Sequence, residues 1–146
     1  MSSYKGKLRL RSCGLLVKGN SILLVQLLSP ITKELIWMPP GGGLEFGETL
    51  EETLKREVRE ETGLHVKAKS LMHVNEVIKD QFHAIEFFYN VEYLSGKLQT
   101  GTDPELSESS QIIKDVAFKN KNELRDLKVV PDYLKEEFWT DYESSL

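Results

Sequence analysis

The chain has 146 residues, of which 40% are hydrophobic and 29% charged, and its formal net charge is −4. This length predicts a single domain, 1–146, with a core of its own, and the composition is typical of a soluble globular protein. The negative balance excludes a basic surface for long nucleic acid, and no apolar run approaches the roughly 18 residues that span a membrane.

We expect no signal peptide, because the first residues lack its apolar segment. One cysteine, Cys13, excludes an internal disulfide and is compatible with a reducing compartment. We therefore expect a cytoplasmic location. Cys13 falls inside a predicted strand with no histidine near it in the sequence, so we expect it to pack as a small buried residue.

Two strands joined by a hairpin are predicted at the start of the chain. After a loose arm at 1–7, residues 8–17 alternate as a strand, and the pair Gly19 and Asn20 signals a hairpin turn. Residues 21–28 form the returning strand, and their nearly continuous apolar character predicts burial on both faces.

Arg9 and Arg11 share one face of the first predicted strand. Two interpretations stay open for this pair. The face is either solvated, or it makes a cationic contact to a phosphate or a base, since a planar guanidinium matches phosphate bidentately.

A stiff turn is predicted after a short strand at 35–38. Pro39 and Pro40 fix two φ angles, so the chain is rigid just before the glycine run at 41–43. We expect a tight turn here, and glycine lets the backbone approach a ligand closely.

The strongest pattern is one helix. Thr49 and Glu52 form a capping box that starts a helix near Leu50, and Gly63 is a natural stop. At about 100° per residue, one stripe of the helix holds both apolar and acidic residues. They are Leu50, Leu54, Glu57, Val58 and Glu61. The stripe that should face the core thus begins as leucine and ends as carboxylate.

The acids on this stripe are unfavourable for the helix itself. Glu57 and Glu61 are a like-charged i,i+4 pair, and Glu60 stands with Glu61 at the negative end of the helix dipole. Two charges about 5 Å apart at an effective dielectric near 20 repel by roughly 3 kcal/mol. A solvated face explains the outward pair Glu51 and Lys55. Acid on the core stripe instead favours a divalent cation, and magnesium prefers hard oxygen ligands, often including phosphates.

The segment 42–64 resembles the Nudix box, G-x5-E-x7-R-E-U-x-E-E-x-G-U, in which U is aliphatic. The matching residues are Gly42, Glu48, Arg56, Glu57, Val58, Glu60, Glu61, Gly63 and Leu64. No position departs from the pattern. The length of the chain and the order of its predicted elements are also similar to those of Nudix hydrolases.

The resemblance implies an α/β fold, an α/β/α sandwich with a mixed β-sheet between helices. It also implies hydrolysis of a nucleoside diphosphate linked to another moiety X, dependent on magnesium, with manganese as the other candidate cation. The implied metal ligands are Glu57, Glu60 and Glu61, with a backbone carbonyl from Gly41 or Gly42. The expected partner is therefore a small nucleotide-type substrate.

Two further residues of the box receive roles by resemblance. Glu48 is expected to bind a second metal or to support the cluster, and Arg56 is expected to hold a ligand carboxylate in place by a salt bridge. The catalytic base stays open among Glu57, Glu61 and an acid of a loop further along the chain.

The remaining elements follow in order. They are strands at 64–78 and 83–94, a polar loop at 95–111, a strand at 112–118, a capped helix at 120–127 and a terminal helix opened by Pro131. Leu134 and Phe138 form the core stripe of the terminal helix, and Trp139 either closes over the core or meets a partner. A homodimer stays open.

The polar loop contains two acids, Glu105 and Glu108. Loops of this length in a compact domain are usually functional or disordered. In many Nudix hydrolases an acid from this region joins the metal cluster or acts as the base, so either residue is a candidate.

Substrate markers downstream of the box are absent. Subfamilies resembling ADP-ribose pyrophosphatases carry a proline where this chain has Asp80, and those resembling dinucleoside polyphosphate hydrolases carry a tyrosine near Gln81 and Phe82. A nucleoside triphosphate or a nucleotide sugar is left as the expected substrate. The alternatives are a non-catalytic nucleotide-binding or sensor module and an RNA 5′-end pyrophosphohydrolase.

Overall fold

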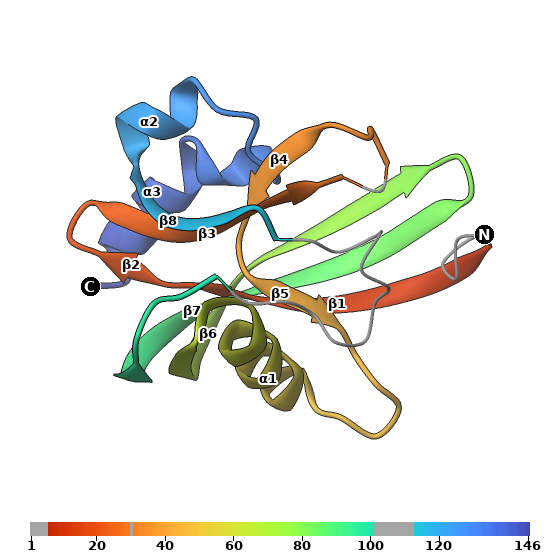
Figure 1. Cartoon of the computed structure of the whole chain (residues 1–146), viewed down its shortest axis with the longest axis horizontal. Helices are drawn as coiled ribbons and strands as arrows, with labels where there is room; N and C mark the ends of the chain where they lie inside the picture. Colours follow the sequence, from red (N-terminus) through yellow and green to blue (C-terminus); the bar gives the residue numbers. More distant parts are fainter. Residues whose placement is uncertain (1–5, 30, 101–112) are drawn as a thin grey trace.

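The computed structural model describes residues 6–29, 31–100 and 113–146. Its elements follow the chain from β1 to α3 (Figure 1). They are β1 (Lys7–Leu15), β2 (Val17–Lys18), β3 (Ser21–Leu28), β4 (Leu35–Met38), β5 (Gly41–Gly43), α1 (Leu50–Thr62), β6 (Leu64–Lys79), β7 (Phe82–Gly96), β8 (Asp115–Asn120), α2 (Lys121–Arg125), the 3₁₀ helix η1 (Asp132–Leu134) and α3 (Glu137–Ser144).

The strands form two sheets. The first sheet has the order β5-β1-β7-β6 and is mixed, because β1 and β7 run parallel while the other neighbours run antiparallel. In the second sheet β3 pairs antiparallel with β2, β4 and β8. Leu16 is the one residue between β1 and β2, so the first predicted strand passes from one sheet into the other there.

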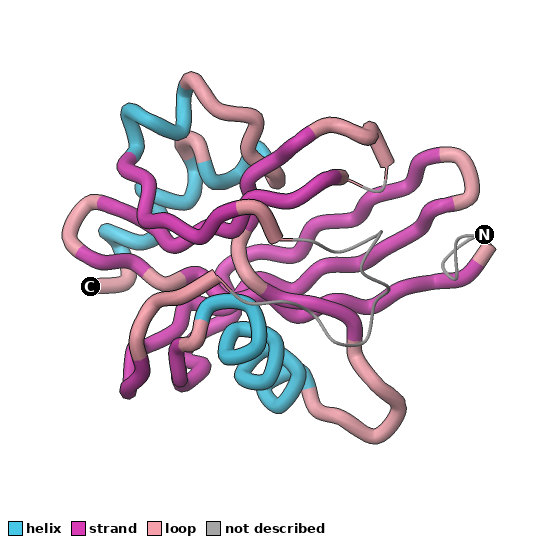
Figure 2. Tube along the Cα trace, viewed as in Figure 1, coloured by secondary structure: helices cyan, strands magenta, loops and turns pink. Residues whose placement is uncertain are grey.

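Helices lie on both sides of the sheets, as the expected α/β/α sandwich requires. In Figures 1 and 2, α1 lies on one side of the molecule, whereas α2 and α3 lie on the other. Successive side chains of β3 point to opposite faces of its sheet, so this strand contributes to the core on both sides. Ile22 and Leu24 join the cluster that α3 closes, while Leu23 and Val25 join the cluster that α1 closes.

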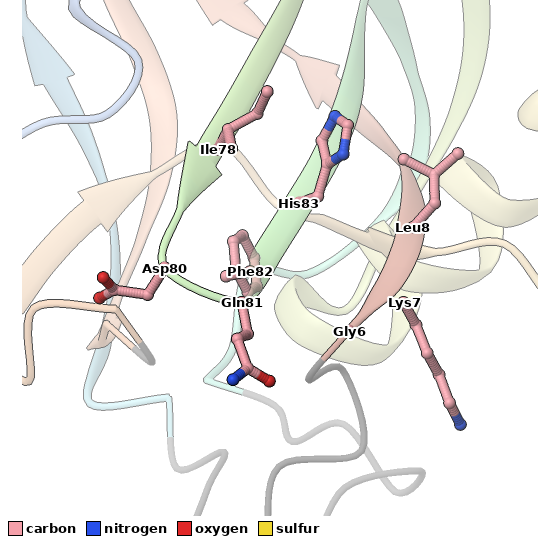
Figure 3. Close-up of a pocket in the computed structure, with 8 residues that line it drawn as sticks. All are labelled: Gly6, Lys7, Leu8, Ile78, Asp80, Gln81, Phe82 and His83. Atoms are coloured by element: carbon pink, nitrogen blue, oxygen red, sulfur yellow. The ribbon is translucent and has the colours of Figure 1, made fainter.

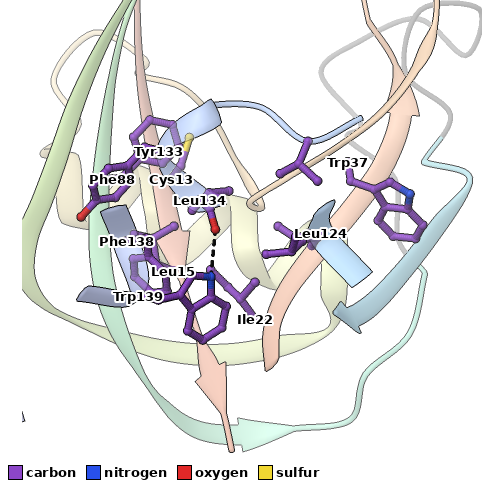
Figure 4. Packing of buried hydrophobic residues seen from close by; sticks show 12 residues of the cluster. Cys13, Leu15, Ile22, Trp37, Phe88, Leu124, Tyr133, Leu134, Phe138 and Trp139 are labelled. Carbon is purple, nitrogen blue, oxygen red and sulfur yellow. Dashed lines mark hydrogen bonds between the residues drawn. The ribbon is translucent and has the colours of Figure 1, made fainter. Parts of the chain in front are cut away.

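The cluster beneath α3 is aromatic (Figure 4). The ring of Phe138 packs edge-on against Tyr133 and Trp139, with centroids 6.0 Å and 5.2 Å apart. The indole of Trp139 donates to the Leu134 carbonyl at 2.9 Å and closes over the core. Cys13 lies in this cluster, and burial raises the pKa of its thiol to about 12, so it packs as expected.

The expected tight turn at the glycine run is wrong. Gly41–Gly43 is strand β5, which pairs antiparallel with β1 so that Gly42 faces Ser12. The amide of Gly14 also bonds to the Pro40 carbonyl at 2.9 Å, which extends the pairing by one residue. The edge of β1 needs a hydrogen-bonding partner, and an extended glycine run supplies one without side chains.

Other expected bounds also shift. Lys7 belongs to β1 rather than to the arm, and β8 begins at Asp115. The terminal helix is interrupted, since η1 ends at Leu134 and α3 begins at Glu137. The Trp139 indole takes the Leu134 carbonyl, an acceptor that a continuous helix would offer to the amide of Phe138. Among the helices of the described chain, none has the length and apolar content of a membrane span.

Candidate active site

Both ends of α1 are fixed by the residues that the sequence indicated. The Thr49 hydroxyl accepts from the Glu52 amide at 3.1 Å, and the Glu52 carboxylate accepts from the Thr49 amide at 3.0 Å. At the other end, Gly63 has φ 80° and donates its amide to the Arg59 carbonyl. The helix therefore starts and stops where predicted, which sets the direction of its acids.

The Glu57 carboxylate lies directly against the backbone of β5. Glu57 is fully buried, and a Cβ placed on Gly42 would stand 2.4 Å from the Glu57 Cδ. No side chain fits at position 42 unless the carboxylate moves. The glycine of the box thus allows the acid to approach the main chain.

Glu61 reaches the same strand from one turn further along α1. It is 8% exposed, and its Oε1 accepts the Gly41 amide at 3.0 Å. Glu57 and Glu61 of the expected ligand set therefore both lie against the backbone of Gly41 and Gly42.

Arg56 connects the acids of the box. Its Nε and Nη2 donate to the two Glu48 oxygens at 2.9 Å each, and its Nη1 lies 2.8 Å from Glu57 and 3.6 Å from Glu60. The salt bridge expected from the sequence is thus present. One guanidinium faces three carboxylates, so negative charge dominates this side of β5.

Glu48 is held from several directions. Besides the bonds from Arg56, Oε1 of Glu48 accepts two further hydrogen bonds. The Thr53 hydroxyl donates one at 2.8 Å, and the Glu45 amide donates the other at 3.0 Å. The hydrogen bonds from Arg56 are the main reason that the pKa of Glu48 falls to about 2. Both Glu48 oxygens already accept hydrogen bonds. This favours a role in which Glu48 supports the metal-binding acids over one in which it binds a metal directly. Thr53 stands at an unrestricted position of the box, so the sequence did not single it out.

The donor set fits a hard divalent cation. Glu57, Glu60 and Glu61 offer carboxylate oxygens within two turns of helix, and the absent side chain of Gly42 leaves the backbone close to them. Within the described ranges, no three acidic side chains already converge on one point. Arg56 instead contacts Glu57 and Glu60, while the Gly41 amide binds Glu61.

The arginines predicted on the first strand lie across β5 from the acids. Arg11 is 9% exposed and forms an ion pair with Glu86 of β7, so the solvated-face interpretation is wrong for this residue. Arg9 is half-buried beside Gly43, where an added Cβ would stand 3.3 Å from its Nε. Sequence reasoning missed Glu86, although an acid on the face of β7 that carries Phe88 was a visible signal.

Glu105 and Glu108 lie outside the described residues. His83 points to the opposite face of the first sheet from Arg11 and contacts Glu76 at 3.0 Å.

An open hollow lies at the far end of the β6–β7 hairpin (Figure 3). It is lined by Gly6, Lys7, Leu8, Ile78, Asp80, Gln81, Phe82 and His83. It shares no residue with the acids of α1, so the chemistry indicated by the sequence does not belong to it.

Comparison with known proteins agrees with this geometry. The family model described as NUDIX domain matches residues 8–133. An ADP-ribose pyrophosphatase from Methanocaldococcus jannaschii is 32% identical over 126 residues, which cover 84% of this chain and 70% of that protein. The human 8-oxo-dGDP phosphatase NUDT18 is 50% identical over 40 residues, 27% of this chain and 12% of that protein.

A solved structure shares the fold. A NUDIX hydrolase from Nitrosomonas europaea superposes with a TM-score of 0.75 at 20% identity, over 95% of this chain and 90% of that one.

Proposed function

This chain belongs to the NUDIX family, and from that premise we propose that it hydrolyses a pyrophosphate bond in a nucleoside diphosphate linked to a second moiety, with magnesium as its cation. One observation carries the proposal. Glu57 and Glu61 are acidic residues buried against a glycine backbone, where an amphipathic helix would place apolar side chains.

Each residue of the box has a distinct task in this proposal. Glu57, Glu60 and Glu61 would hold the cation, and a carbonyl of Gly41 or Gly42 would complete the protein's ligand set. Magnesium bound there supplies charge for the phosphate oxygens and lowers the pKa of an attacking water. Arg56 orients Glu57 and Glu60, and Glu48 in turn orients Arg56.

The Gly41 amide fixes the other end of the ligand set. It donates to Oε1 of Glu61 at 3.0 Å, which ties this acid to β5. Glu57 and Glu61 stand as candidates for the general base, together with Glu105 and Glu108.

ADP-ribose is the first substrate to test, because the relative from M. jannaschii is named for that activity. The backbone at position 80, where such enzymes carry the proline marker, does not suit proline. Asp80 stands in the turn between β6 and β7 with φ 56°, whereas proline holds φ near −65°. Nucleoside triphosphates and nucleotide sugars are the next candidates.

A substrate panel with magnesium tests the proposal. It contains ADP-ribose, nucleoside triphosphates, nucleotide sugars, dinucleoside polyphosphates and capped RNA, and phosphate or nucleotide release is measured. We expect turnover of a small nucleotide. Exclusive turnover of capped RNA would support an RNA-end hydrolase instead, and binding without any turnover would support a sensor module.

Glu61→Gln tests the site. We expect a folded protein that loses at least about 10²-fold of its magnesium-dependent kcat, because the substitution removes a ligand charge or a base. Glu51→Gln is the matched control, since Glu51 is exposed on the same helix. Near-wild-type kcat in Glu61→Gln, with an unchanged magnesium requirement, would contradict the assignment.

A further inference from the structure

A row of polar side chains crosses the first sheet at one level. Arg11 of β1 stands opposite Gly43 of β5 on one side and Glu86 of β7 on the other, and Glu86 stands opposite Asn75 of β6. Residues paired in this way project from the same face of a sheet. Arg11, Glu86 and Asn75 therefore form one line on the face that α1 does not cover.

The members of this row hold one another. Arg11 Nη1 donates to Glu86 Oε2, and Asn75 Nδ2 donates to Glu86 Oε1 at 3.1 Å. Arg11 and Glu86 are 9% and 8% exposed. Both Glu86 oxygens are thus engaged, and the guanidinium is held from one side by its Nη1.

The rest of the Arg11 guanidinium is available for another acceptor. A guanidinium has five N–H donors, and in the described part of the chain the buried Nε of Arg11 has no hydrogen-bond partner. A buried donor left without an acceptor costs about 1–3 kcal/mol. The Arg11 side chain keeps 11% of its surface exposed, so the group is not sealed from a ligand.

Structural stabilisation alone is a weak reason for this arrangement. Replacing a buried ion pair with apolar residues is often neutral or stabilising. The neighbouring positions on the same face, Cys13 and Phe88, are part of the hydrophobic cluster, so apolar residues suit this face. A charged row next to that cluster is better explained by something that it binds.

The row lies beside the acids of α1. Burial by itself lowers the pKa of the Arg11 guanidinium, but the carboxylates of Glu86 and Glu61 help to hold that pKa above its usual value. Glu61 is therefore close enough to interact with Arg11. Only β5 separates the two sides. A Cβ added to Gly42 would meet Glu57, whereas a Cβ added to Gly43 would meet Arg9.

We propose that Glu86 and Asn75 are positioning residues that hold the Arg11 guanidinium for a phosphate oxygen of the substrate, on the side of β5 opposite Glu57. A guanidinium suits this role because it is planar and permanently charged. The part of the substrate beyond the cleaved bond then lies on the side of β5 that carries Arg11. The inference rests on the proposed function.

Kinetics of single variants test this role. With the best substrate of the panel and saturating magnesium, Arg11→Gln should raise KM by about 10-fold or more, since hydrogen bonds to charged groups contribute about 1.5–3 kcal/mol. Glu86→Gln and Asn75→Ala should raise KM by smaller factors and leave kcat within about 3-fold, and Arg11→Lys should restore part of the loss.

The matched control lies one residue away on the same strand. Glu76 projects from the opposite face of β6, is exposed and contacts His83, so Glu76→Gln should leave KM unchanged. The double variant Arg11→Gln/Glu86→Gln should have a KM no higher than that of Arg11→Gln alone, because Glu86 acts through Arg11.

Two outcomes separate this inference from the proposed function. If wild-type protein turns over a panel substrate but Arg11→Gln and Glu86→Gln change only the melting temperature and not KM, the row is structural and the inference is wrong. If no substrate is turned over, the proposed function fails. In that case, titration calorimetry can still test the row. Weaker binding of ADP-ribose by Arg11→Gln than by wild type would support its role in ligand binding.

Discussion

At the scale of single residues, Gly42 shows that the absence of a side chain can be a requirement of the site. Its backbone packs against the Glu57 carboxyl group, and an added methyl group would stand 2.4 Å from Cδ and 2.6 Å from Oε2. Neither atom is the free end of a side chain in open solvent, because Glu57 is fully buried and bonded to Arg56.

Gly42→Ala should therefore displace the Glu57 carboxylate. We expect a higher magnesium concentration at half-maximal activity and at least about 10-fold lower kcat, with a destabilisation of about 1–3 kcal/mol from overpacking. Magnesium titrations of activity and urea unfolding measure the two effects.

Gly43→Ala is the neighbouring comparison. Its added methyl group would meet the end of the Arg9 side chain at 3.3 Å, and this end can move. The magnesium dependence of Gly43→Ala should stay close to that of wild type. Equal magnesium dependence in Gly42→Ala would contradict the role given to the glycine.

At the scale of elements, the loop before α1 is joined to the helix by Glu48 and Arg56. The pKa of Glu48 is lowered from 4.5 to about 2, mainly by the Arg56 hydrogen bonds. A carboxylate with a depressed pKa stabilises the fold above its unfolded pKa, and this contribution is lost as the pH falls through the folded pKa.

Glu48→Gln should thus be less stable than wild type at pH 7, and the difference should shrink between about pH 4.5 and 2. Urea unfolding at several pH values checks this. Glu51→Gln, an exposed position on the same helix, should change stability by no more than about 0.5 kcal/mol at pH 7. A pH-independent difference for Glu48→Gln would show that lost packing, not charge, is responsible.

The elements also show what the sequence could predict. The helix α1 was predicted to its terminal residues because its signals are local: a capping box at Thr49, a stop at Gly63 and a period of 3.6 residues. The candidate acids lie on this one helix, so their shared position on it followed as well. The strand formed by Gly41–Gly43 did not, because glycine has no strand propensity and the pairing with β1 is non-local.

The proposed row on the other side of β5 shows the same limit. Glu86 meets Arg11, and Asn75 meets Glu86, only through the register of three strands, and nothing near them in the sequence reports that register. Their positions on alternating faces were predictable, whereas their alignment across β1, β7 and β6 was not. The segment with Glu105 and Glu108 lies outside the described chain, so its role stays a prediction.

At the scale of the whole molecule, stability depends on two hydrophobic clusters that share β3. The cluster beneath α3 contains no acid of the box, and Phe138 is fully buried at its centre. Side chains of this cluster can therefore be changed without touching the acids of the box.

Phe138→Ala should cost about 3–5 kcal/mol of unfolding free energy, because it leaves a cavity among Tyr133, Trp139 and Tyr142. Phe46→Ala makes the same change at a fully exposed position and should stay within about 0.5 kcal/mol of wild type. Denaturant unfolding compares the two. Similar losses would mean that α3 does not close the core, and the folded fraction of Phe138→Ala should keep the wild-type magnesium dependence.

The glycine strand β5 has a consequence for redesign. The acids on one side of it come from a single continuous segment, which a designer can transplant as a block. The row on the other side is distributed over three strands, so it can be varied in a combinatorial library at positions 11, 75 and 86 while the block stays constant. Length changes belong in the Asp80–Gln81 turn, since one residue inserted within β6 would invert its faces. The proposed roles in hydrolysis and in substrate binding could in this way be varied separately.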